Sequence, residues 1–354
     1  MRRNTKWLFT VNPGIEDIAA NEIRNEIGGN IKYNNMAGHV IAELDNDISY
    51  ESIYRLRTIN RAIKIIWEGV AERSIHYLAK LKNILLKELD SIIEYITPEI
   101  SFAVRSERIG IHEYTSMDLS RVLGDVVIDI ISKKYSKRPQ VNLRAPDVIV
   151  YAFLRENKLV IGIQYTGPWS LHRRSYRIYD HPAALKPTLA TAMLYLVGTK
   201  DKSIIVDPMC GGGTIPIEAA LLHEDAYILG LDINPVHIKG SMKNAVAAGV
   251  FHRTIFRVWD ARKLHELGLD IDYVVTNPPY GIRYGSPTAI KRLYRKFIFS
   301  LEKALAVNGK VAIITTEYAY LHKIIEYSQL KIVHERTVAH GGLYPHIIIL
   351  EKKS

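Results

Sequence analysis

The sequence predicts an α/β protein in which two small α+β units precede a C-terminal domain with a largely parallel sheet. From about Ser203 onward, short apolar runs alternate regularly with helical segments, a pattern typical of parallel strands joined by right-handed crossovers. Before Ser203, strand-like and helical segments follow one another less regularly. The length of 354 residues exceeds one ordinary domain and favours two or three separate cores.

The N-terminal half is predicted to contain two units, at residues 1–65 and 66–167. In the first, a helical pattern begins after Pro13-Gly14-Ile15-Glu16 and stops at Gly28-Gly29. A strand over residues 40–44 and a helix over 48–56 follow. The second unit is expected to contain helices at 75–95 and 116–135 and strands at 101–105, 148–154 and 158–166. A linker over residues 168–202 connects these units to the C-terminal domain.

The C-terminal domain, residues 203–354, is predicted to contain five parallel strands and a closing antiparallel hairpin. The strands lie at residues 203–207, 226–231, 254–258, 271–276 and 310–315, with helices at 214–223, 235–248 and 288–306. Residues 330–338 and 346–352 form the hairpin, which places one antiparallel strand at or near the sheet edge. Ligands of such sheets bind at the carboxyl ends of the strands.

Composition narrows the classes of protein. A formal charge of +10 favours a polyanionic partner. The single cysteine, Cys210, excludes an internal disulfide and a multi-cysteine zinc site, which fits a reducing cytoplasm. No segment reaches the ~18 uninterrupted apolar residues of a membrane span. We expect a cytoplasmic protein with no membrane partner and no metal. The sequence does not determine the oligomeric state, and a monomer is favoured.

Basic residues gather in the second unit and the linker. Between residues 133 and 177, ten lysines and arginines face only Asp147 and Glu156. Such a stretch is either a solvated face or a surface for phosphate backbones. The candidate substrate-binding residues are Lys133, Lys134, Arg144, Arg173, Arg174 and Arg177.

Three acidic residues and a glycine turn at successive strand ends predict a site for S-adenosylmethionine. Asp207 precedes Gly211-Gly212-Gly213, whose backbone and following helix N-terminus can hold a carboxylate, and Asp207 itself can bind an ammonium. Asp232 can accept from two ribose hydroxyls and Asp260 from an adenine amine. A glycine turn and a distal acid also occur in nicotinamide enzymes, and Asp232 alone is a plausible helix N-cap. The candidate cofactor-binding residues are Asp207, Cys210, Gly211, Gly213, Thr214, Asp232, Ile233, Asp260, Ala261 and Asn277.

The segment Asn277-Pro278-Pro279-Tyr280-Gly281 follows the fourth strand and predicts catalysis on an exocyclic amine. The lone pair of such an amine is delocalised into the ring. The side-chain oxygen of Asn277 and the backbone oxygen of Pro278 can each accept one N–H and direct the lone pair at a methyl donor. Tyr280 offers a ring face for an extruded base. We therefore expect Asn277, Pro278 and Tyr280 to be catalytic; the alternative is an ordinary proline-rich turn.

Over nearly its whole length the chain resembles the THUMP-domain tRNA guanine-N2 methyltransferases. The segments that carry the resemblance are Asn12-Pro13-Gly14-Ile15-Glu16, Phe102-Ala103-Val104-Arg105, Leu171-His172-Arg173-Arg174-Ser175-Tyr176-Arg177, the segment from His181 to Ala190, the glycine turn and the Asn277–Gly281 segment. The resemblance implies a ferredoxin-like domain, a THUMP domain that binds the CCA end of tRNA, and a Rossmann-like methyltransferase domain. It also implies a linker helix beside the cofactor. Ser175 stands where the family pattern has glycine.

Within this family, the asparagine at 277 resembles the enzymes that modify guanosine at position 6 of the tRNA acceptor stem, because the archaeal enzymes for position 10 typically have Asp there. The resemblance therefore implies position 6 as the target. Position 10, ribosomal RNA and adenine-N6 methylation of nucleic acid remain alternatives. A protein-glutamine methyltransferase would leave the basic N-terminal half without a purpose. A non-catalytic tRNA-binding adaptor would not need Asp207, Asp232, Asp260 and Asn277 together.

Overall fold

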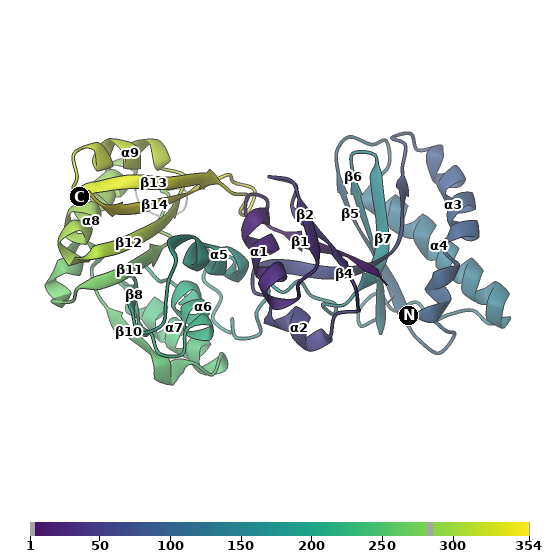
Figure 1. Cartoon of the computed structure of the whole chain (residues 1–354), viewed down its shortest axis with the longest axis horizontal. Helices are drawn as coiled ribbons and strands as arrows, with labels where there is room; N and C mark the ends of the chain where they lie inside the picture. The colour runs from purple at the N-terminus through teal and green to yellow at the C-terminus, as the bar shows by residue number, and fades with distance from the viewer. Residues whose placement is uncertain (1–3, 282–285, 354) are drawn as a thin grey trace.

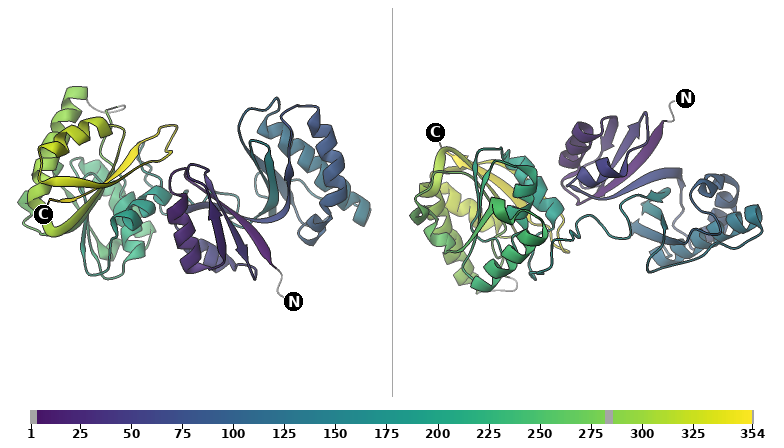
Figure 2. Two further views of the ribbon diagram at one scale, coloured as in Figure 1. Left: turned by 45° about the horizontal axis from the view of Figure 1, so that its top comes forward. Right: turned by 90° about the horizontal axis from the view of Figure 1, so that it is seen from below.

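The computed structural model describes residues 4–281 and 286–353. The molecule is elongated, with the C-terminal domain at one end, the unit that contains α3 and α4 at the other, and the first N-terminal unit between them (Figures 1 and 2). None of the helices within the described ranges is long and apolar enough to cross a membrane.

The N-terminal half contains one seven-stranded sheet rather than two. Its order is β2-β3-β1-β4-β7-β6-β5. The strands are β1 (Thr5–Val11), β2 (Asn30–Tyr33), β3 (His39–Leu44), β4 (Ile59–Val70), β5 (Phe102–Ile109), β6 (Val148–Arg155) and β7 (Lys158–Gln164). Residues 59–64 of β4 pair with β1, and residues 63–70 pair with β7. The boundary expected at 65/66 therefore falls inside a strand that both units share.

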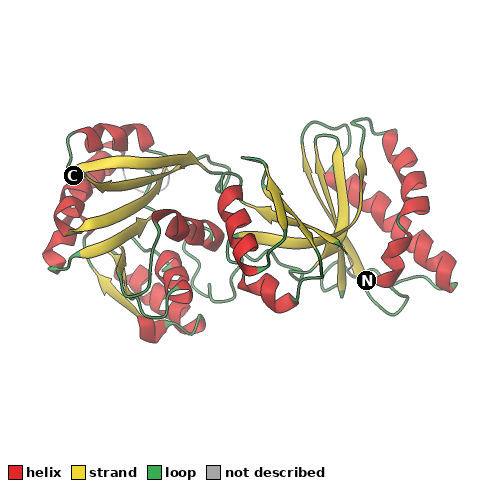
Figure 3. Ribbon diagram, viewed as in Figure 1, coloured by secondary structure: helices red, strands yellow, loops and turns green. Residues whose placement is uncertain are grey.

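Helices cover this sheet in two groups, which Figure 3 shows at opposite ends. The helices are α1 (Glu16–Glu26), α2 (Tyr50–Arg55), α3 (Tyr77–Glu88), the short η1 (Asp90–Glu94) and α4 (Ser116–Tyr135). The helix expected over 75–95 is thus divided into α3 and η1. A capping box begins α4, because the Thr115 hydroxyl accepts from the Asp118 backbone and Asp118 accepts from the Thr115 backbone.

The C-terminal sheet has the order β10-β9-β8-β11-β12-β14-β13. Its strands are β8 (Ile204–Asp207), β9 (Tyr227–Asp232), β10 (Thr254–Val258), β11 (Ile271–Thr276), β12 (Leu305–Thr315), β13 (Leu330–Thr337) and β14 (His346–Lys352). Strands β8 to β12 are parallel, and β14 is antiparallel to both of its neighbours. The expected hairpin is confirmed, with its antiparallel strand next to the edge.

Helices lie on both faces of the C-terminal sheet (Figure 1). They are α5 (Pro187–Val197), α6 (Thr214–Leu222), α7 (Pro235–Ala247), α8 (Pro287–Ala304) and α9 (Tyr318–Glu326), with the short η2 (Phe251–Arg253) and η3 (Ala261–Leu267). Helix α5 belongs to the linker and packs between this sheet and α1 (Figure 1). A single apolar core extends from Trp7 and Phe9 through Leu189 to Val275 and Ile347, so the two sheets are joined by buried contacts.

The segment Asn12-Pro13-Gly14 docks on the loop between β13 and β14. Asn12 Nδ2 donates to the Ala339 carbonyl at 3.0 Å, and the Ala339 amide donates to the Pro13 carbonyl at 2.9 Å. Gly14 has a φ of 98°, and a Cβ atom there would lie 2.3 Å from the Thr337 carbonyl oxygen. Only glycine fits this close approach, which gives the N-terminal part of the resemblance a physical reason.

A buried carboxylate holds three parts of the chain together. Glu218 of α6 accepts hydrogen bonds from Arg57 Nη2 at 2.6 Å, the Tyr176 hydroxyl at 2.7 Å and the Thr191 hydroxyl at 2.9 Å. Arg174 Nε approaches the same carboxylate at 3.3 Å. Burial raises the pKa of Glu218, but Arg174 and Arg57 outweigh it and hold the pKa below its ordinary value. The N-terminal sheet, the linker and the C-terminal domain thus meet at one ion network.

Candidate active site

The structure brings the predicted strand-end residues to one edge of the C-terminal sheet. Asp207 ends β8 and Asp232 ends β9, while Asp260 and Asn277 follow β10 and β11. Strands β8 and β11 are neighbours, and the Thr276 hydroxyl donates to Asp207 Oδ1 at 2.8 Å. The glycine turn and the Asn277–Gly281 turn therefore lie beside each other, as the strand pattern predicts.

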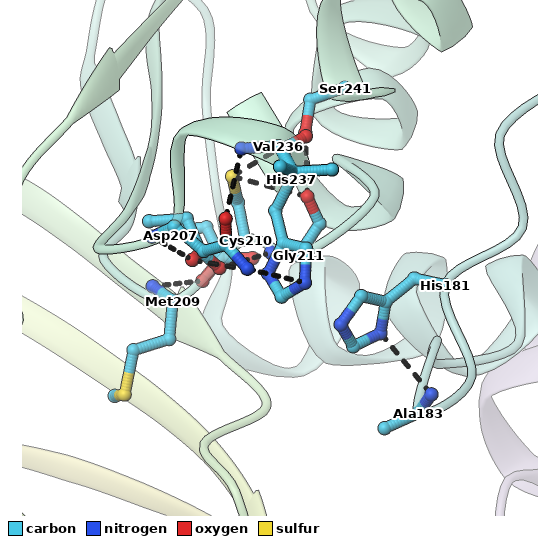
Figure 4. Close-up of polar contacts among 11 residues, drawn as sticks. His181, Ala183, Asp207, Met209, Cys210, Gly211, Val236, His237 and Ser241 are labelled. Carbon is cyan, nitrogen blue, oxygen red and sulfur yellow. Dashed lines mark hydrogen bonds and ion pairs between the residues drawn. The ribbon is translucent and has the colours of Figure 1, made fainter. Parts of the chain in front are cut away.

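Asp207 is a buried carboxylate without a cation. Its side chain is 3% exposed, and Oδ1 also accepts from the Met209 amide at 3.1 Å (Figure 4). Burial raises its pKa to about 7, and no lysine, arginine or histidine among the described residues forms an ion pair with it. Burying a charge costs free energy unless it is paired, so this site fits an ammonium group.

The glycine turn is fixed by side chains from neighbouring elements. The Gly211 amide donates to Asp232 Oδ2 at 2.9 Å, and the Ser241 hydroxyl donates to the Gly211 carbonyl at 2.7 Å. Gly213 has a φ of 78°, and a Cβ atom there would lie 2.9 Å from Ser241 Cβ. Thr214 begins α6 immediately afterwards, and its first turn carries free N–H groups.

The carboxylate of Asp232 already accepts three hydrogen bonds from the protein. Its Oδ1 accepts from the Asn234 amide at 2.8 Å and from His237 Nδ1 at 3.2 Å, in addition to the Gly211 contact on Oδ2. A carboxylate offers about four acceptor positions, so one position remains for a ribose hydroxyl. A second hydroxyl would have to displace His237. The adjacent Ile233 is 63% exposed and offers an apolar surface.

The expectation for Asp260 and Ala261 is only partly met. Asp260 lies at the predicted strand end, but Arg262 Nε and Nη2 contact both of its oxygens at 2.6 to 2.9 Å. The hydrogen bonds from Arg262 lower the pKa of Asp260. Because these contacts occupy the carboxylate, an adenine amine cannot bind it unless Arg262 moves. Ala261 is buried at the start of η3.

The side chain of Cys210, one of the predicted cofactor-binding residues, is buried behind the glycine turn. Its side chain is 7% exposed, and Sγ lies 3.8 Å from the Ser241 hydroxyl (Figure 4). Its backbone amide donates to the Leu231 carbonyl, and its carbonyl accepts from the Gly213 amide. Burial raises the pKa of the thiol well above its ordinary value. Cys210 therefore supports the turn.

The orientation of the Asn277 amide is set by two hydrogen bonds. The Tyr280 hydroxyl donates to Asn277 Oδ1 at 2.6 Å, and Asn277 Nδ2 donates to the Ala183 carbonyl at 3.3 Å. Within the described ranges, the Pro278 carbonyl accepts no hydrogen bond. Burial raises the pKa of Tyr280, so its hydroxyl remains a neutral donor. One lone pair of Oδ1 and the Pro278 oxygen are left to accept.

Two histidines beside the glycine turn were not expected from the sequence. The His181 ring lies 4.4 Å from the His237 ring in an edge-to-face contact, and a Cβ atom on Gly211 would lie 3.5 Å from His181 (Figure 4). Burial and then the neighbouring His237 lower the pKa of His181. The resemblance implies a linker helix beside the cofactor but gives His181 no role, and the fold places the His181 side chain against the glycine turn.

The structure separates the predicted substrate-binding residues into two groups. The side chains of one group are exposed, and this group contains Lys133, Lys134, Arg144 and Arg173. The guanidinium carbon of Arg173 lies 5.3 Å from the centre of the Trp169 ring, and Trp169 is 58% exposed. An exposed cation on an exposed indole suits contact with phosphates and bases.

The expectation for Arg174 is wrong, because its side chain is 12% exposed and is bound to Glu218 and to the Arg57 carbonyl. Arg177 is 19% exposed, and its Nη2 lies 2.8 Å from Asp180 Oδ1. Both guanidinium groups have protein partners. A count of basic residues along the sequence could not show this, because Glu218 is distant in the chain.

Comparison with known proteins agrees with this geometry. Residues 174–346 match the family described as RMKL-like, methyltransferase domain, and residues 92–164 match the THUMP domain. A tRNA (guanine(6)-N2)-methyltransferase of Archaeoglobus fulgidus is 33% identical over 370 residues, covering 97% of this chain and 91% of the relative. One of Methanocaldococcus jannaschii is 32% identical over 388 residues, covering 97% and 99%. The crystal structure of TrmN from Thermus thermophilus has a TM-score of 0.82 at 25% identity, covering 98% and 99%.

The sheet order and the strand-end residues define the class of the protein, which is an S-adenosylmethionine-dependent methyltransferase. Its N-terminal half includes a THUMP domain. The chain belongs to the family of THUMP-domain tRNA guanine-N2 methyltransferases.

Proposed function

We propose that this chain methylates the exocyclic N2 amine of the guanosine at position 6 of tRNA, in the acceptor stem. The observation that carries the proposal is the pair of acceptors after β11, Asn277 Oδ1 and the Pro278 carbonyl, beside the buried Asp207. The two archaeal relatives, both tRNA (guanine(6)-N2)-methyltransferases, support position 6. The asparagine at 277, rather than aspartate, supports it as well.

The residues at the strand ends fit S-adenosylmethionine, which supplies the methyl group when bound. Asp207 lacks a cation and would hold the ammonium. The start of α6 at Thr214 would hold the carboxylate through its backbone N–H groups. The Gly211 and Gly213 amides already donate to Asp232 and to the Cys210 carbonyl, so these glycines would shape the turn around the carboxylate. Asp232 would accept a ribose hydroxyl, and Ile233 would contact the adenine ring.

Asn277 and Pro278 would act on the guanine. Each oxygen accepts one N–H of the N2 amine, which directs the nitrogen lone pair away from the ring and toward the methyl group. The bond from N2 to the methyl carbon would form as the bond from that carbon to the cofactor sulfur breaks, with its electron pair left on sulfur, and one N2 proton would be lost to solvent. Tyr280 keeps Oδ1, rather than Nδ2, facing the amine. The half-buried Tyr280 ring also offers a face on which the flipped base can stack.

The N-terminal half would bind the RNA. We assign the CCA end to the THUMP domain and the phosphate backbone to Lys133, Lys134, Arg144 and Arg173, all of which are exposed. A tRNA that lacks its CCA end should then be methylated more slowly.

The test is transfer of a tritiated methyl group to unmodified tRNA transcripts, followed by nucleoside mass spectrometry and mapping of the product. We expect N2-methylguanosine at position 6, and turnover about a hundredfold lower in Asn277→Ala with nearly unchanged tRNA affinity. Product at position 10, in ribosomal RNA, or as N6-methyladenosine would refute the assignment. Normal turnover of Asn277→Ala would refute the catalytic role of the turn.

A further inference from the structure

A cavity of about 300 Å³ lies where the N-terminal sheet, the linker and the loop between β13 and β14 meet. Figure 1 shows this loop reaching from the C-terminal sheet toward α1. The main polar lining residues are Thr10, Asn60, Arg61, His172, Lys186 and His340. Neither the glycine turn nor the Asn277–Gly281 turn lines this cavity, so it is separate from the candidate active site.

Unpartnered polar atoms are concentrated in this cavity. Thr10 Oγ1, Asn60 Oδ1, Arg61 Nε and His340 Nδ1 are buried and have no hydrogen-bond partner. They are four of the nine such side-chain atoms found in residues 4–281 and 286–353. Thr10 is 4% exposed and Asn60 is 9% exposed. Buried polar atoms are paired as a rule, so four unpaired ones in residues that line one cavity give it an unusually polar wall, although contact with an occupant would come from the accessible groups of that wall.

The charges around the cavity favour an anion. Among the described residues, Arg61 and Lys186 form no ion pair, and neither side chain donates a hydrogen bond. Burial lowers the pKa of Lys186, and Arg61 lowers it further, while Glu107 raises it. Glu107 is the one acid in the lining, and it accepts from the Tyr151 hydroxyl at 2.7 Å. Two cations facing one carboxylate leave a net positive site.

The two histidines are neutral beside these cations. Burial, and then neighbouring positive groups that include Lys186, lower the pKa of His172 and of His340 to about 4. The Ser170 hydroxyl donates to the Asn60 carbonyl at 3.2 Å, so His172 Nδ1 is the donor in its 2.6 Å contact with Ser170. An anion in the cavity would reduce the repulsion among these groups.

We propose that this cavity binds one phosphate group of the RNA backbone near the target nucleotide, through Arg61 and Lys186. The proposal rests on the proposed function. Lys186 is three residues from Ala183, whose carbonyl accepts from Asn277 Nδ2 at 3.3 Å, and three residues span at most about 11 Å. A guanidinium and an ammonium are the side-chain groups that position phosphates. The bound phosphate would set the RNA backbone beside the catalytic turn.

The test compares Lys186→Met with the wild type in tRNA binding at several salt concentrations. Loss of one phosphate contact should reduce the slope of log affinity against log salt by about 0.7 to 0.9, so between about 50 and about 200 mM salt the wild type loses about threefold more affinity than the variant. Lys186→Arg should keep the wild-type slope. The matched control is Lys303→Met, because Lys303 is exposed on the last turn of α8, away from the cavity.

Arg61→Gln should reduce the slope as Lys186→Met does, and calorimetry should show wild-type cofactor affinity in both. Wild-type slopes in both variants would overturn the proposal. Thermal stabilisation by inorganic phosphate that depends on Lys186, without a change in RNA slope, would identify a free anion and overturn the RNA source. Methyl transfer by the wild type is measured in parallel. Normal N2-methylguanosine with unchanged slopes refutes only the cavity, whereas no methylated guanine refutes the proposed function.

Discussion

Asp207→Asn tests whether the buried carboxylate at the end of β8 binds the ammonium of the cofactor. Asparagine has nearly the same shape, and its oxygen can keep the hydrogen bonds from Met209 and Thr276. The substitution therefore removes the negative charge with little change in packing. Because burial raises the pKa of Asp207 to about 7, the cofactor-free protein carries a proton there at mildly acidic pH, whereas ammonium binding requires the ionised form.

The expected magnitude follows from the ionised fraction. With this pKa, about a tenth of the wild-type protein is ionised at about pH 6 and about three quarters at about pH 7.5, so cofactor affinity should rise about eightfold. Asp207→Asn should bind the cofactor at least about tenfold more weakly, because a charge-assisted hydrogen bond is lost. Any pH dependence that comes from the histidines or from the cofactor amine remains in the variant, so the difference between the two curves isolates Asp207.

The assay is calorimetric titration of both proteins with S-adenosylmethionine at these two pH values. Equal wild-type affinities at the two pH values would refute the reasoning, as would the same rise in both proteins. Unfolding of the cofactor-free proteins gives an independent result. Between pH 3.8 and about 7 the native state holds a proton on Asp207 that the unfolded chain has lost. Wild-type stability from this group therefore falls as pH rises, and Asp207→Asn should be the more stable protein above pH 7 but not below pH 3.8.

Three further predictions concern other contacts. If only the ring face of Tyr280 mattered, Tyr280→Phe would be fully active, but its hydroxyl donates to Asn277 at 2.6 Å, so we expect about tenfold lower turnover with retained tRNA affinity. Tyr280→Ala should lose most of the activity. Wild-type turnover of Tyr280→Phe would contradict the role of the hydroxyl. Arg173→Gln should reduce the salt dependence of tRNA binding without changing stability, whereas Arg174→Gln should lower the free energy of unfolding by about 1–3 kcal/mol in urea titrations. Unchanged stability of Arg174→Gln together with a reduced salt dependence of its tRNA binding would show that Arg174 faces RNA. Gly14→Ala should lower the melting temperature more than Gly28→Ala, because both positions have positive φ but nothing lies within 4 Å of a Cβ atom on Gly28; equal losses would show that the docking contact at Gly14 is unimportant.

The sequence predicts the C-terminal sheet well because its signals are local. Four of its strands are short apolar runs with a candidate site residue, Asp207, Asp232, Asp260 or Asn277, at or just after the end. The observed β10 (Thr254–Val258) and β11 (Ile271–Thr276) have the predicted bounds. The carboxyl ends of neighbouring parallel strands lie at the same edge of the sheet, so such residues come together however the helices pack. Asp207 and Asn277 could therefore be placed on one edge without knowledge of any long-range contact.

The failures come from contacts between distant parts of the chain. Strand β4 carries polar residues such as Lys64 and Glu68, so its amphipathic pattern is weak, and its pairing with both β1 and β7 is not visible locally. Arg174 counts as a free charge until α6 places Glu218 beside it. His181 has no evident role until the linker returns to the glycine turn.

The buried Glu218 network and the shared strand β4 have a consequence for which nucleotide is modified. Both joints between the THUMP domain and the catalytic turn are fixed, one by an uninterrupted strand and the other by a buried ion network. If the CCA end is held at one end of this span, the length of the protein sets the number of nucleotides between that end and the modified base. A change of target position would then require altered joints, in residues that never contact the methylated base.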